Sequence, residues 1–373
     1  MREKPYTIPM FDDCLIMAGG AGTRLWPASS SRLPKQFLPA CEGMSFFSMA
    51  VERALAVTGK SGKVIVITGK SHVPLVIKET AKLKAGEKKR LVVIGEPAAK
   101  NTAPAIACAA IYSLYGGRDR NMLVLTSDHI IKPLDVFKED ASKAAASAKD
   151  GKLAVFGIPP AGPETGYGYI EAGKGKDVLE VTAFHEKPDT QTAKKYAASK
   201  RFFWNSGMFA FSSGFITEQF RLLAPDVIHP FEKLKKPPQS YKIVQGVQIL
   251  DAWSGLENAY RKTAGISFDY AIAEKCRNTV MVRANFDWID IGNWEEYVKI
   301  CGNKSQVFSV SAENCHVDSD IPVALAGVQD LIVVIRSGKN GEPAAALVTR
   351  KGQTQKVREI AERIKKAGKT ELL

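Results

Sequence analysis

Residues 14–24 read CLIMAGGAGTR, a short apolar run that passes directly into glycines. Such a run predicts a buried strand that ends in a tight loop. Similar apolar runs alternate with helical patterns through the first half of the chain, and this order favours a doubly wound, mostly parallel α/β sheet of Rossmann-like type. The expected strands are 14–18, 64–68, 91–95, 122–126 and 153–157, and the expected helices are 46–57, 72–85, 102–114 and 134–148.

The second half of the chain is organised differently. Beyond about residue 160 the pattern loosens into segments rich in Gly, Pro and aromatic residues, which predict loops around a second pocket. After residue 300, short β-rich pieces lead into a helix near 355–366. We therefore expect a large catalytic domain over 1–298 and a small, strand-rich C-terminal domain over 299–373.

The composition is that of an ordinary globular protein, with 45% apolar and 24% charged residues. The N-terminal residues lack the apolar segment of a signal peptide, and no apolar run is long enough to span a bilayer. A cytoplasmic location is therefore expected. The cysteines are scattered without metal-ligand spacing, which predicts buried free thiols. They are Cys14, Cys41, Cys108, Cys276, Cys301 and Cys315.

The net charge of +13 calls for an anionic partner or a solvated basic surface. Nucleic acid is one candidate partner. The basic residues are dispersed among acids, however, with few aromatics between them, and this pattern is typical of solvated helix faces. A small, highly charged substrate such as a nucleotide explains the excess of Lys and Arg equally well.

The glycine loop is the first candidate site. Glycines after a strand let backbone N–H groups approach a phosphate closely, and Arg24 and Lys35 add charge-assisted contacts to phosphate oxygens. The Walker A pattern GxxxxGK[ST] is absent, and GxGxxG fails because Leu25 stands where its third glycine belongs. The loop therefore indicates a nucleotide triphosphate site of another kind.

Two acidic residues stand where a metal ion could bind. Asp128 follows a predicted strand, and ligands bind at the carboxyl ends of such strands. Asp290 is embedded among large apolar residues, so its carboxylate needs a cation, a donor or water. Mg²⁺ is held by one or two carboxylates together with phosphate oxygens. The alternative is that each acid caps a helix or pairs with an Arg.

A third cluster comprises Glu186, Lys187 and Asn205 in the segments FHEKP and WNSGM. Their side chains can bind sugar hydroxyls and a sugar phosphate, and the neighbouring aromatics can pack on a sugar ring. Each segment is also explained as a plain turn. His129 is a candidate for supporting Asp128 from behind.

Together these segments resemble the sugar-1-phosphate nucleotidyltransferases, and most closely the bacterial mannose-1-phosphate guanylyltransferases. Eight segments occur in the family's order across nearly 300 residues. They are MAGGAGTRLWPASSSRLPKQFL (17–38), EPAAKNTAPAIA (96–107), LTSDHII (125–131), TGYGYIE (165–171), FHEKP (184–188), WNSGMFAF (204–211), SFDYAIAEK (267–275) and WIDIGNWEEY (288–297).

The resemblance implies a nucleotidyltransferase core followed by a β-helix-like C-terminal region. It also implies a role for each matching residue. Gly19, Gly20, Gly22, Thr23, Asn101, Thr102 and Pro104 would bind the nucleotide, Arg24 and Lys35 its phosphates and the reacting groups, Asp128 and Asp290 a Mg²⁺ ion, and Gly168, Glu186, Lys187 and Asn205 the mannose 1-phosphate.

The implied reaction is attack of mannose 1-phosphate on the α-phosphorus of GTP, with release of pyrophosphate. The implied partners are these two substrates and a second copy of the chain in a homodimer, with neither nucleic acid nor membrane. Longer relatives carry an isomerase domain, and the expectation here is a monofunctional enzyme. Another sugar 1-phosphate or nucleotide, or a non-catalytic regulatory protein on the same fold, are the alternatives.

Overall fold

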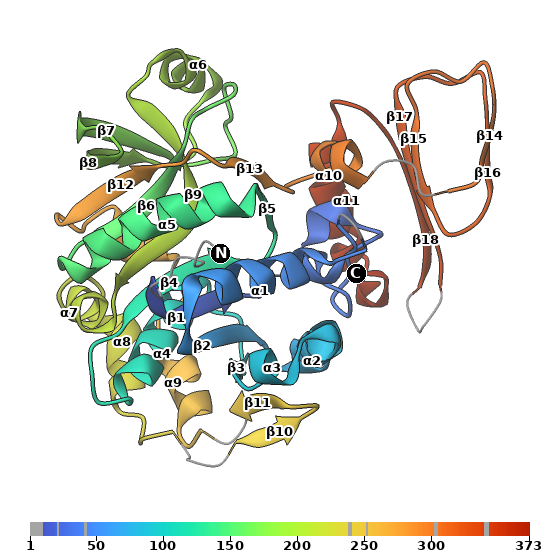
Figure 1. Cartoon of the computed structure of the whole chain (residues 1–373). Helices are drawn as coiled ribbons and strands as arrows, with labels where there is room; N and C mark the ends of the chain where they lie inside the picture. Colours follow the sequence, from blue (N-terminus) through green and yellow to red (C-terminus); the bar gives the residue numbers. More distant parts are fainter. Residues whose placement is uncertain are drawn as a thin grey trace, which may run out of the picture. The chain divides into compact units, whose positions relative to one another are not determined.

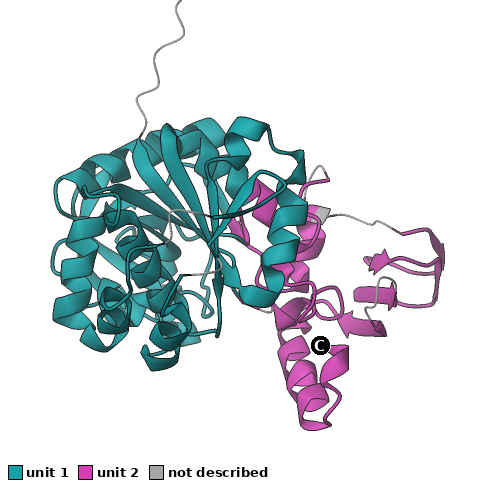
Figure 2. Cartoon of the chain, turned by 90° about the horizontal axis from the view of Figure 1, so that it is seen from below, with its two compact units in different colours: residues 1–19, 50–127, 131–288 teal, residues 20–49, 128–130, 289–373 magenta. Residues whose placement is uncertain are grey.

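The computed structural model describes residues 10–20, 22–40, 43–237, 241–250, 253–301, 305–338 and 343–373. The chain divides into two compact units, each assembled from separate stretches of sequence (Figure 2). Unit 1 comprises residues 1–19, 50–127 and 131–288, and unit 2 comprises residues 20–49, 128–130 and 289–373. The two units are described in turn.

Unit 1 is built on one large sheet (Figure 1). Among the described residues it has eleven strands in the order β10-β11-β3-β2-β1-β4-β9-β6-β12-β8-β7. The strands are β1 (Phe11–Met17), β2 (Thr58–Gly69), β3 (Leu91–Glu96), β4 (Asn121–Thr126), β6 (Leu153–Ile158), β7 (Tyr169–Gly175), β8 (Val178–His185), β9 (Phe202–Ser212), β10 (Lys242–Val244), β11 (Val247–Leu250) and β12 (Thr279–Arg283).

The prediction of a mostly parallel sheet is correct for one half of this sheet and wrong for the whole. Strands β11, β3, β2, β1 and β4 pair in parallel, as the alternation of strands and helices predicts. Strand β9 then enters antiparallel between β4 and β6, and β7 and β8 form an antiparallel hairpin. The sheet is therefore mixed. The reversals fall where the sequence pattern loosens: β7 and β8 are joined as a hairpin, and β9 runs antiparallel to β4, β6 and β7.

Helices cover the sheet of unit 1. Helix α4 (Thr102–Leu114) packs against β1 and β2, and α5 (Leu134–Lys149) packs against β6 and β9 (Figure 1). The alanines of α4 are buried, which lets the helix lie close to strands that are apolar on both faces. The remaining helices are α1 (Phe46–Val57), α2 (Val73–Glu79), α3 (Ala85–Lys88), α6 (Thr190–Ala198), α7 (Ser213–Leu223), α8 (Pro225–Glu232) and α9 (Leu256–Lys262).

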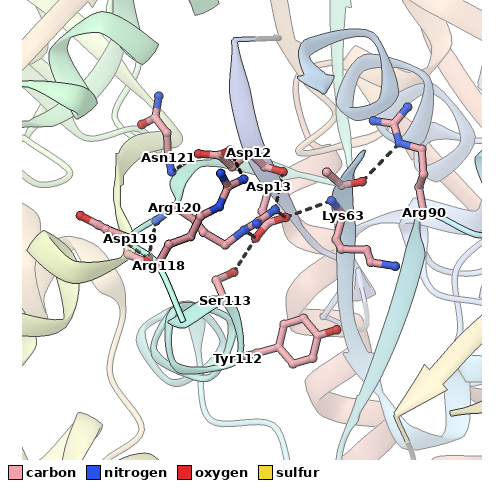
Figure 3. A network of polar contacts seen from close by, with 12 residues as sticks. Asp12, Asp13, Lys63, Arg90, Tyr112, Ser113, Arg118, Asp119, Arg120 and Asn121 are labelled. Atoms are coloured by element: carbon pink, nitrogen blue, oxygen red, sulfur yellow. Dashed lines mark hydrogen bonds and ion pairs between the residues drawn. The ribbon is translucent and has the colours of Figure 1, made fainter. Parts of the chain in front are cut away.

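A polar network fixes the amino-terminal ends of β1 and β4 (Figure 3). Asp13 is 1% exposed, and its carboxylate accepts hydrogen bonds from Arg120 Nη2 (2.7 Å), Ser113 Oγ (2.9 Å) and the backbone N–H of Lys63 (2.9 Å). A buried carboxylate is tolerated when it is paired and hydrogen-bonded in this way. At the other ends of these strands, Met17 and Thr126 stand opposite each other, so the segments that follow them start side by side.

The C-terminal part of unit 2 is rich in strands, as predicted. Strands β14 and β16 pair in parallel, and so do β15 and β17, in each case joining residues 16 positions apart. Strand β18 pairs antiparallel with β17, and the helix predicted near 355–366 is α11 (Val357–Lys366). The other elements are β14 (Val307–Val310), β15 (His316–Ser319), β16 (Val323–Ala326), β17 (Leu331–Ser337), β18 (Ala344–Arg350) and α10 (Trp294–Cys301).

The apolar core of unit 2 joins the segment 22–40 to the C-terminal region. Leu25, Trp26, Trp294 and Val357 belong to one buried cluster. The Trp26 indole N–H donates to the backbone oxygen of Leu372 (2.7 Å), and the Trp294 indole N–H donates to the backbone oxygen of Trp26 (3.0 Å). The segment after the glycines is thus held by residues more than 250 positions away in the chain.

The cysteines of the described region are free thiols. Cys14, Cys108 and Cys276 are buried, as predicted, whereas Cys315 is half-buried. Burial raises the pKa of Cys14 and Cys108, which leaves these thiols protonated and unreactive. Cys41 and the side chain of Cys301 lie outside the described residues. In the part of the chain that the structure describes, no helix has the length and apolar character needed to cross a membrane.

Candidate active site

Lys35 is the centre of a charged cluster in unit 2. Its Nζ lies 2.8 Å from Oδ2 of Asp128 and 3.2 Å from Oδ1 of Asp290. The Lys35 side chain is 7% exposed, whereas Asp128 keeps 35% and Asp290 19% of its side chain exposed. Three of the residues predicted from the sequence therefore meet, although they are up to 255 positions apart.

The loop geometry places Lys35 at this point. Lys35 opens the short helix 35–37 directly after Pro34. A Cβ on Gly22 would lie 2.3 Å from Cβ of Lys35, and Gly22 has a φ of +63°, so only glycine fits there. The Ser29 hydroxyl donates to the backbone oxygen of Gly22 (2.6 Å) and fixes this approach. The contact with Lys35 therefore requires a glycine here.

The charges of the cluster stabilise one another. Removal from water alone would raise the pKa of Asp128, but the Lys35 ammonium and the His129 imidazole hold it well below its usual range. Burial alone would lower the pKa of Lys35, but the two carboxylates raise it. His129 Nε2 lies 3.7 Å from Asp128 and 3.9 Å from Asp290, so it neighbours the acid that it is expected to support.

Arg24 approaches the same cluster from the glycine loop. A Cβ on Gly292 would lie 3.4 Å from Nη1 of Arg24 and 3.8 Å from Oδ2 of Asp290, so the guanidinium and the carboxylate both lie next to this glycine. Thr23 and Arg24 are exposed, and Leu25 anchors the turn in the core. Gly20 has a φ of +96°, while Ala21 lies outside the described residues. Exposed cations and glycine backbone suit a polyanion.

The acids of the cluster suit a divalent cation only in part. Within the described ranges, no group of three or more His, Cys, Asp or Glu side chains could hold a metal ion. Asp128 and Asp290 converge on a single ammonium, so their oxygens can also converge on one ion. Mg²⁺ commonly takes one or two carboxylates and completes its shell with water and phosphate oxygens. The donor set fits that mode of binding.

A second cluster of predicted residues lies in unit 1. A Cβ on Gly168 would lie 2.6 Å from Oε2 of Glu186, and the backbone N–H of Asn205 donates to the backbone oxygen of Gly168 (2.8 Å). Lys187 Nζ lies 2.8 Å from Oε1 of Glu186, and its φ of +43° marks a constrained turn. The structure thus brings together Gly168, Glu186, Lys187 and Asn205, as predicted.

Asp269 is a member of this cluster that the sequence analysis missed. Its Oδ1 accepts a hydrogen bond from Nδ2 of Asn205 (2.7 Å), and the Asn205 Oδ1 accepts one from the backbone N–H of Gly207 (3.1 Å). Burial is the main cause that raises the pKa of Asp269. Both ends of the Asn205 amide are therefore fixed. The signal was an acid between two aromatics in SFDYAIAEK, within a π-helical turn (Asp269–Ala273) of a kind frequent at functional sites.

Aromatic rings adjoin this second cluster. The ring centroid of Tyr167 lies 5.3 Å from that of Trp204 and 5.4 Å from that of Trp288, both edge-on. Trp204 is 8% exposed, and its indole N–H has no hydrogen-bond partner among the residues described. An aromatic wall with one unused donor suits a ligand that has both an apolar face and hydroxyl groups.

The residues predicted to bind the nucleotide base lie at the start of α4. Asn101 is exposed with a φ of 70°, and its side chain accepts from the backbone N–H of Thr102 (2.9 Å). The Thr102 hydroxyl accepts from the backbone N–H of Phe268 (2.8 Å), and Pro104 is buried inside the helix. Of these three residues, Asn101 is the most exposed to a ligand.

Glu96 is another residue that the sequence analysis did not single out. It ends β3 and is 9% exposed, and its Oε2 lies 3.8 Å from the position of a Cβ on Gly19. Burial raises its pKa to about 7, against a smaller opposing effect of the Tyr260 hydroxyl. Its Oε1 accepts no hydrogen bond within the described part of the chain. A buried acid with an unused oxygen beside the first glycine is a candidate ligand contact.

The chain is similar in sequence to known proteins over almost its whole length. The family described as Nucleotidyl transferase matches residues 13–306, a range that contains both clusters. The xanthan biosynthesis protein XanB of Xanthomonas campestris is 34% identical over 364 residues, which cover 96% of this chain and 74% of that protein. A mannose-1-phosphate guanylyltransferase of Escherichia coli is 33% identical over 376 residues, with the same two shares.

A solved structure is similar over almost the whole chain. The crystal structure of a mannose-1-phosphate geranyltransferase from Thermus thermophilus has a TM-score of 0.79 and 28% sequence identity. The similarity covers 95% of this chain and 99% of that one. It therefore extends over the strand-rich C-terminal region as well as the large sheet.

Proposed function

The chain belongs to the nucleotidyl transferase family and is a sugar nucleotidyltransferase, and within that class we propose that it transfers GMP from GTP to mannose 1-phosphate. The products are GDP-mannose and pyrophosphate. The observation that carries the proposal is the convergence of Lys35, Asp128 and Asp290 beside a glycine loop that also bears Arg24. The relatives that bear the name mannose-1-phosphate guanylyltransferase support the choice of substrates.

The reaction needs charge neutralisation and positioning more than proton transfer. A phosphate oxygen of mannose 1-phosphate attacks the α-phosphorus of GTP in line, a new P–O bond forms, and the bond to the pyrophosphate oxygen breaks. The nucleophile is already an anion at neutral pH, so a general base is dispensable. The main barrier is the mutual repulsion of two polyanions, and Arg24 and Lys35 would offset it.

The carboxylates Asp128 and Asp290 would hold Mg²⁺ through their oxygens. When bound, the ion supplies positive charge to the phosphate oxygens. Gly22 would let the backbone approach the same oxygens, because it lacks a side chain and has a left-handed conformation. Gly19, Gly20 and Thr23 would line the rest of the loop.

The sugar side of the reaction is assigned to unit 1. The amide of Asn205 and the carboxylate of Glu186 would bind sugar hydroxyls, and Lys187 would neutralise the sugar phosphate. The fixed amide of Asn205 supports this assignment, because a preoriented group loses little freedom on binding. Base recognition is assigned to Asn101, Thr102 and Pro104. The family resemblance further supports a homodimer, which light scattering would test.

The test of substrate choice is a pyrophosphate-release assay with GTP, ATP, UTP and dTTP, each against mannose 1-phosphate and glucose 1-phosphate. We expect GTP with mannose 1-phosphate to give the highest kcat/KM by at least about tenfold, which is a difference of about 1.4 kcal/mol in transition-state binding. Comparable rates with UTP and glucose 1-phosphate would overturn the assignment of both the base and the sugar.

A further inference from the structure

We infer that the Lys35 ammonium and a divalent cation compete for the same two carboxylates, so that the cation binds there only once phosphates have drawn Lys35 away. This inference rests on the proposed role of Asp128 and Asp290 as metal ligands. It adds a role for Lys35 that precedes the reaction. In the absence of nucleotide, Lys35 would exclude the metal, and with nucleotide bound the same side chain would contact phosphate.

The first argument is distance. The ammonium of Lys35 lies 2.8 Å from one carboxylate and 3.2 Å from the other, so it occupies the space between them. A Mg²⁺ ion bound to both acids would lie about 2.1 Å from an oxygen of each. Such an ion and an ammonium in its present place would be near neighbours of like charge in a partly desolvated site, where their repulsion is strong.

The second argument is charge. Asp128 and Asp290 together carry two negative charges, and Lys35 compensates one of them at hydrogen-bond distance. His129 Nε2 lies 3.7 Å from Asp128 and 3.9 Å from Asp290, and the Arg24 guanidinium lies beside Gly292, next to Asp290. A divalent cation therefore meets acids whose negative charge is already partly compensated. A bound triphosphate would change this, because its several negative charges give the site an excess of negative charge that a divalent cation can neutralise.

The third argument is mobility within a fixed frame. The Lys35 backbone and Cβ are held against Gly22, where no side chain could fit between them. Beyond Cβ the flexible lysine stem still has its Cγ, Cδ and Cε methylenes, so its ammonium can turn about this fixed base from the carboxylates to a nearby phosphate oxygen. Binding of the nucleotide and of the cation would then strengthen each other, and such coupling is reciprocal.

The test measures the binding of Mn²⁺ alone to the full chain. The concentration of free Mn²⁺ is monitored by electron paramagnetic resonance. In the variant Lys35→Met, which has a similar length and no charge, we expect Mn²⁺ to bind at least about tenfold more tightly than in the wild type. The variant Lys35→Arg keeps the charge and should bind Mn²⁺ as weakly as the wild type. Unchanged or weaker Mn²⁺ binding in Lys35→Met would overturn the inference.

Two controls fix the location of the effect. Lys143→Met removes a lysine that pairs with Asp140 at 2.9 Å in unit 1, and it should leave Mn²⁺ binding unchanged. Adding Asp290→Asn to Lys35→Met should abolish the gain, and retention of the gain would contradict the inference. Because a variant could lose its fold, each is compared by circular dichroism, and Lys35→Gln repeats the test in a different side chain.

This experiment is independent of the substrates. If the chain failed to use GTP and mannose 1-phosphate while Lys35→Met still gained Mn²⁺ affinity, the proposed substrates would be wrong and the competition between Lys35 and the cation would be supported. If turnover were as proposed and Mn²⁺ affinity did not rise, the proposed substrates would be supported and the competition would be refuted.

Discussion

The polar clusters of the two units differ in what holds them together. In unit 2, Lys35, Asp128 and Asp290 are joined by ion pairs, so removal of one charged side chain would leave its partners without the opposite charge that compensates them. The unit 1 cluster also contains an ion pair, between Lys187 and Glu186, but its Asn205 amide is fixed by hydrogen bonds to Asp269 and to backbone. Full charges suit phosphates, and oriented neutral groups suit hydroxyls. The difference separates contacts to the nucleotide phosphates from recognition of the sugar hydroxyls.

The two clusters also differ in their support. The four predicted residues of the unit 1 cluster lie on or next to the strands β7, β8 and β9 of one continuous sheet. The segment that carries Arg24 and Lys35 is instead packed on α11 and α10, through Trp26, Val357 and Trp294. The unit 1 cluster is thus held by strands of one sheet, whereas the segment with Arg24 and Lys35 is held by residues from the far C-terminal part of the sequence. Changes in the C-terminal region should therefore act on nucleotide binding.

The largest effect is expected from Lys35→Ala. Removing the ammonium leaves the phosphates of the reaction without a positioned cation, and we expect kcat to fall by about 10²–10³-fold, in the range found for loss of one electrostatic contact. Steady-state assay of pyrophosphate release would measure it. Asp290→Ala should have an effect of similar size. Turnover near that of the wild type in either variant, with the fold intact by circular dichroism, would remove that residue from the site.

The next effect concerns stability in unit 1 and depends on pH. The pKa of Glu96 is about 7 in the folded chain and near 4.5 in the unfolded one, so the folded state binds the proton more tightly. Folding stability is therefore lost as the pH rises from about 4.5 to about 7. Glu96→Gln, which stays neutral, should be more stable than the wild type by about 3 kcal/mol at pH 8 and by about 1 kcal/mol or less at pH 5.

Urea unfolding at the two pH values would measure this difference. Glu52→Gln is the matched control, since Glu52 is an exposed acid on α1, and its effect should stay within about 0.5 kcal/mol at both pH values. An equal effect of Glu96→Gln at pH 5 and pH 8 would show that the carboxyl group does not titrate as described.

A smaller effect is expected from Asp269→Asn. The change weakens the hydrogen bond that orients the Asn205 amide, so the KM for the sugar phosphate should rise by about tenfold. The KM for the nucleotide should stay within about twofold. Both follow from initial rates at varied substrate, with Asp226→Asn on α8 as an exposed control. A rise in the nucleotide KM alone would reverse the assignment of this cluster.

The smallest effect is expected from Trp26→Phe, which removes the indole N–H donated to Leu372 and keeps an aromatic ring. Loss of one hydrogen bond of about 1 kcal/mol should raise the KM for the nucleotide by about fivefold, because the loop is less firmly held. Trp253→Phe is a matched control, since its indole N–H also donates to a backbone oxygen at 2.7 Å, but in unit 1. Similar changes of the nucleotide KM in both variants would contradict a role for the C-terminal region.

Much of this was accessible from the sequence. Apolar periodicity located the strands of the parallel half and the helices α1 and α4, because buried strands and amphipathic helices leave local patterns. The direction of β9 was not accessible, since an apolar strand has the same pattern in parallel and antiparallel pairing. The grouping of three separate stretches into unit 2 was not predictable either, because these stretches come together only in the folded chain.

The candidate sites, too, could be predicted from the sequence only in part. Lys35, Asp128 and Asp290 could be singled out because each is a charged residue in an unusual local setting. Their mutual pairing could not, because it depends on which segments meet. Glu96 and Asp269 were missed for a related reason. Their raised pKa values come from burial by distant residues, and a single acid in a motif carries no local sign of that.

The most direct test of the division between the units is a crossed kinetic measurement on Arg24→Ala and Asn205→Ala. Arg24→Ala should raise the KM for GTP by about tenfold or more and leave the KM for mannose 1-phosphate within about twofold, since its charge is assigned to the nucleotide phosphates. Asn205→Ala should do the reverse. If each variant raised both KM values equally, or if the two effects were exchanged, the assignment of the nucleotide phosphates to unit 2 and of mannose 1-phosphate to unit 1 would be wrong.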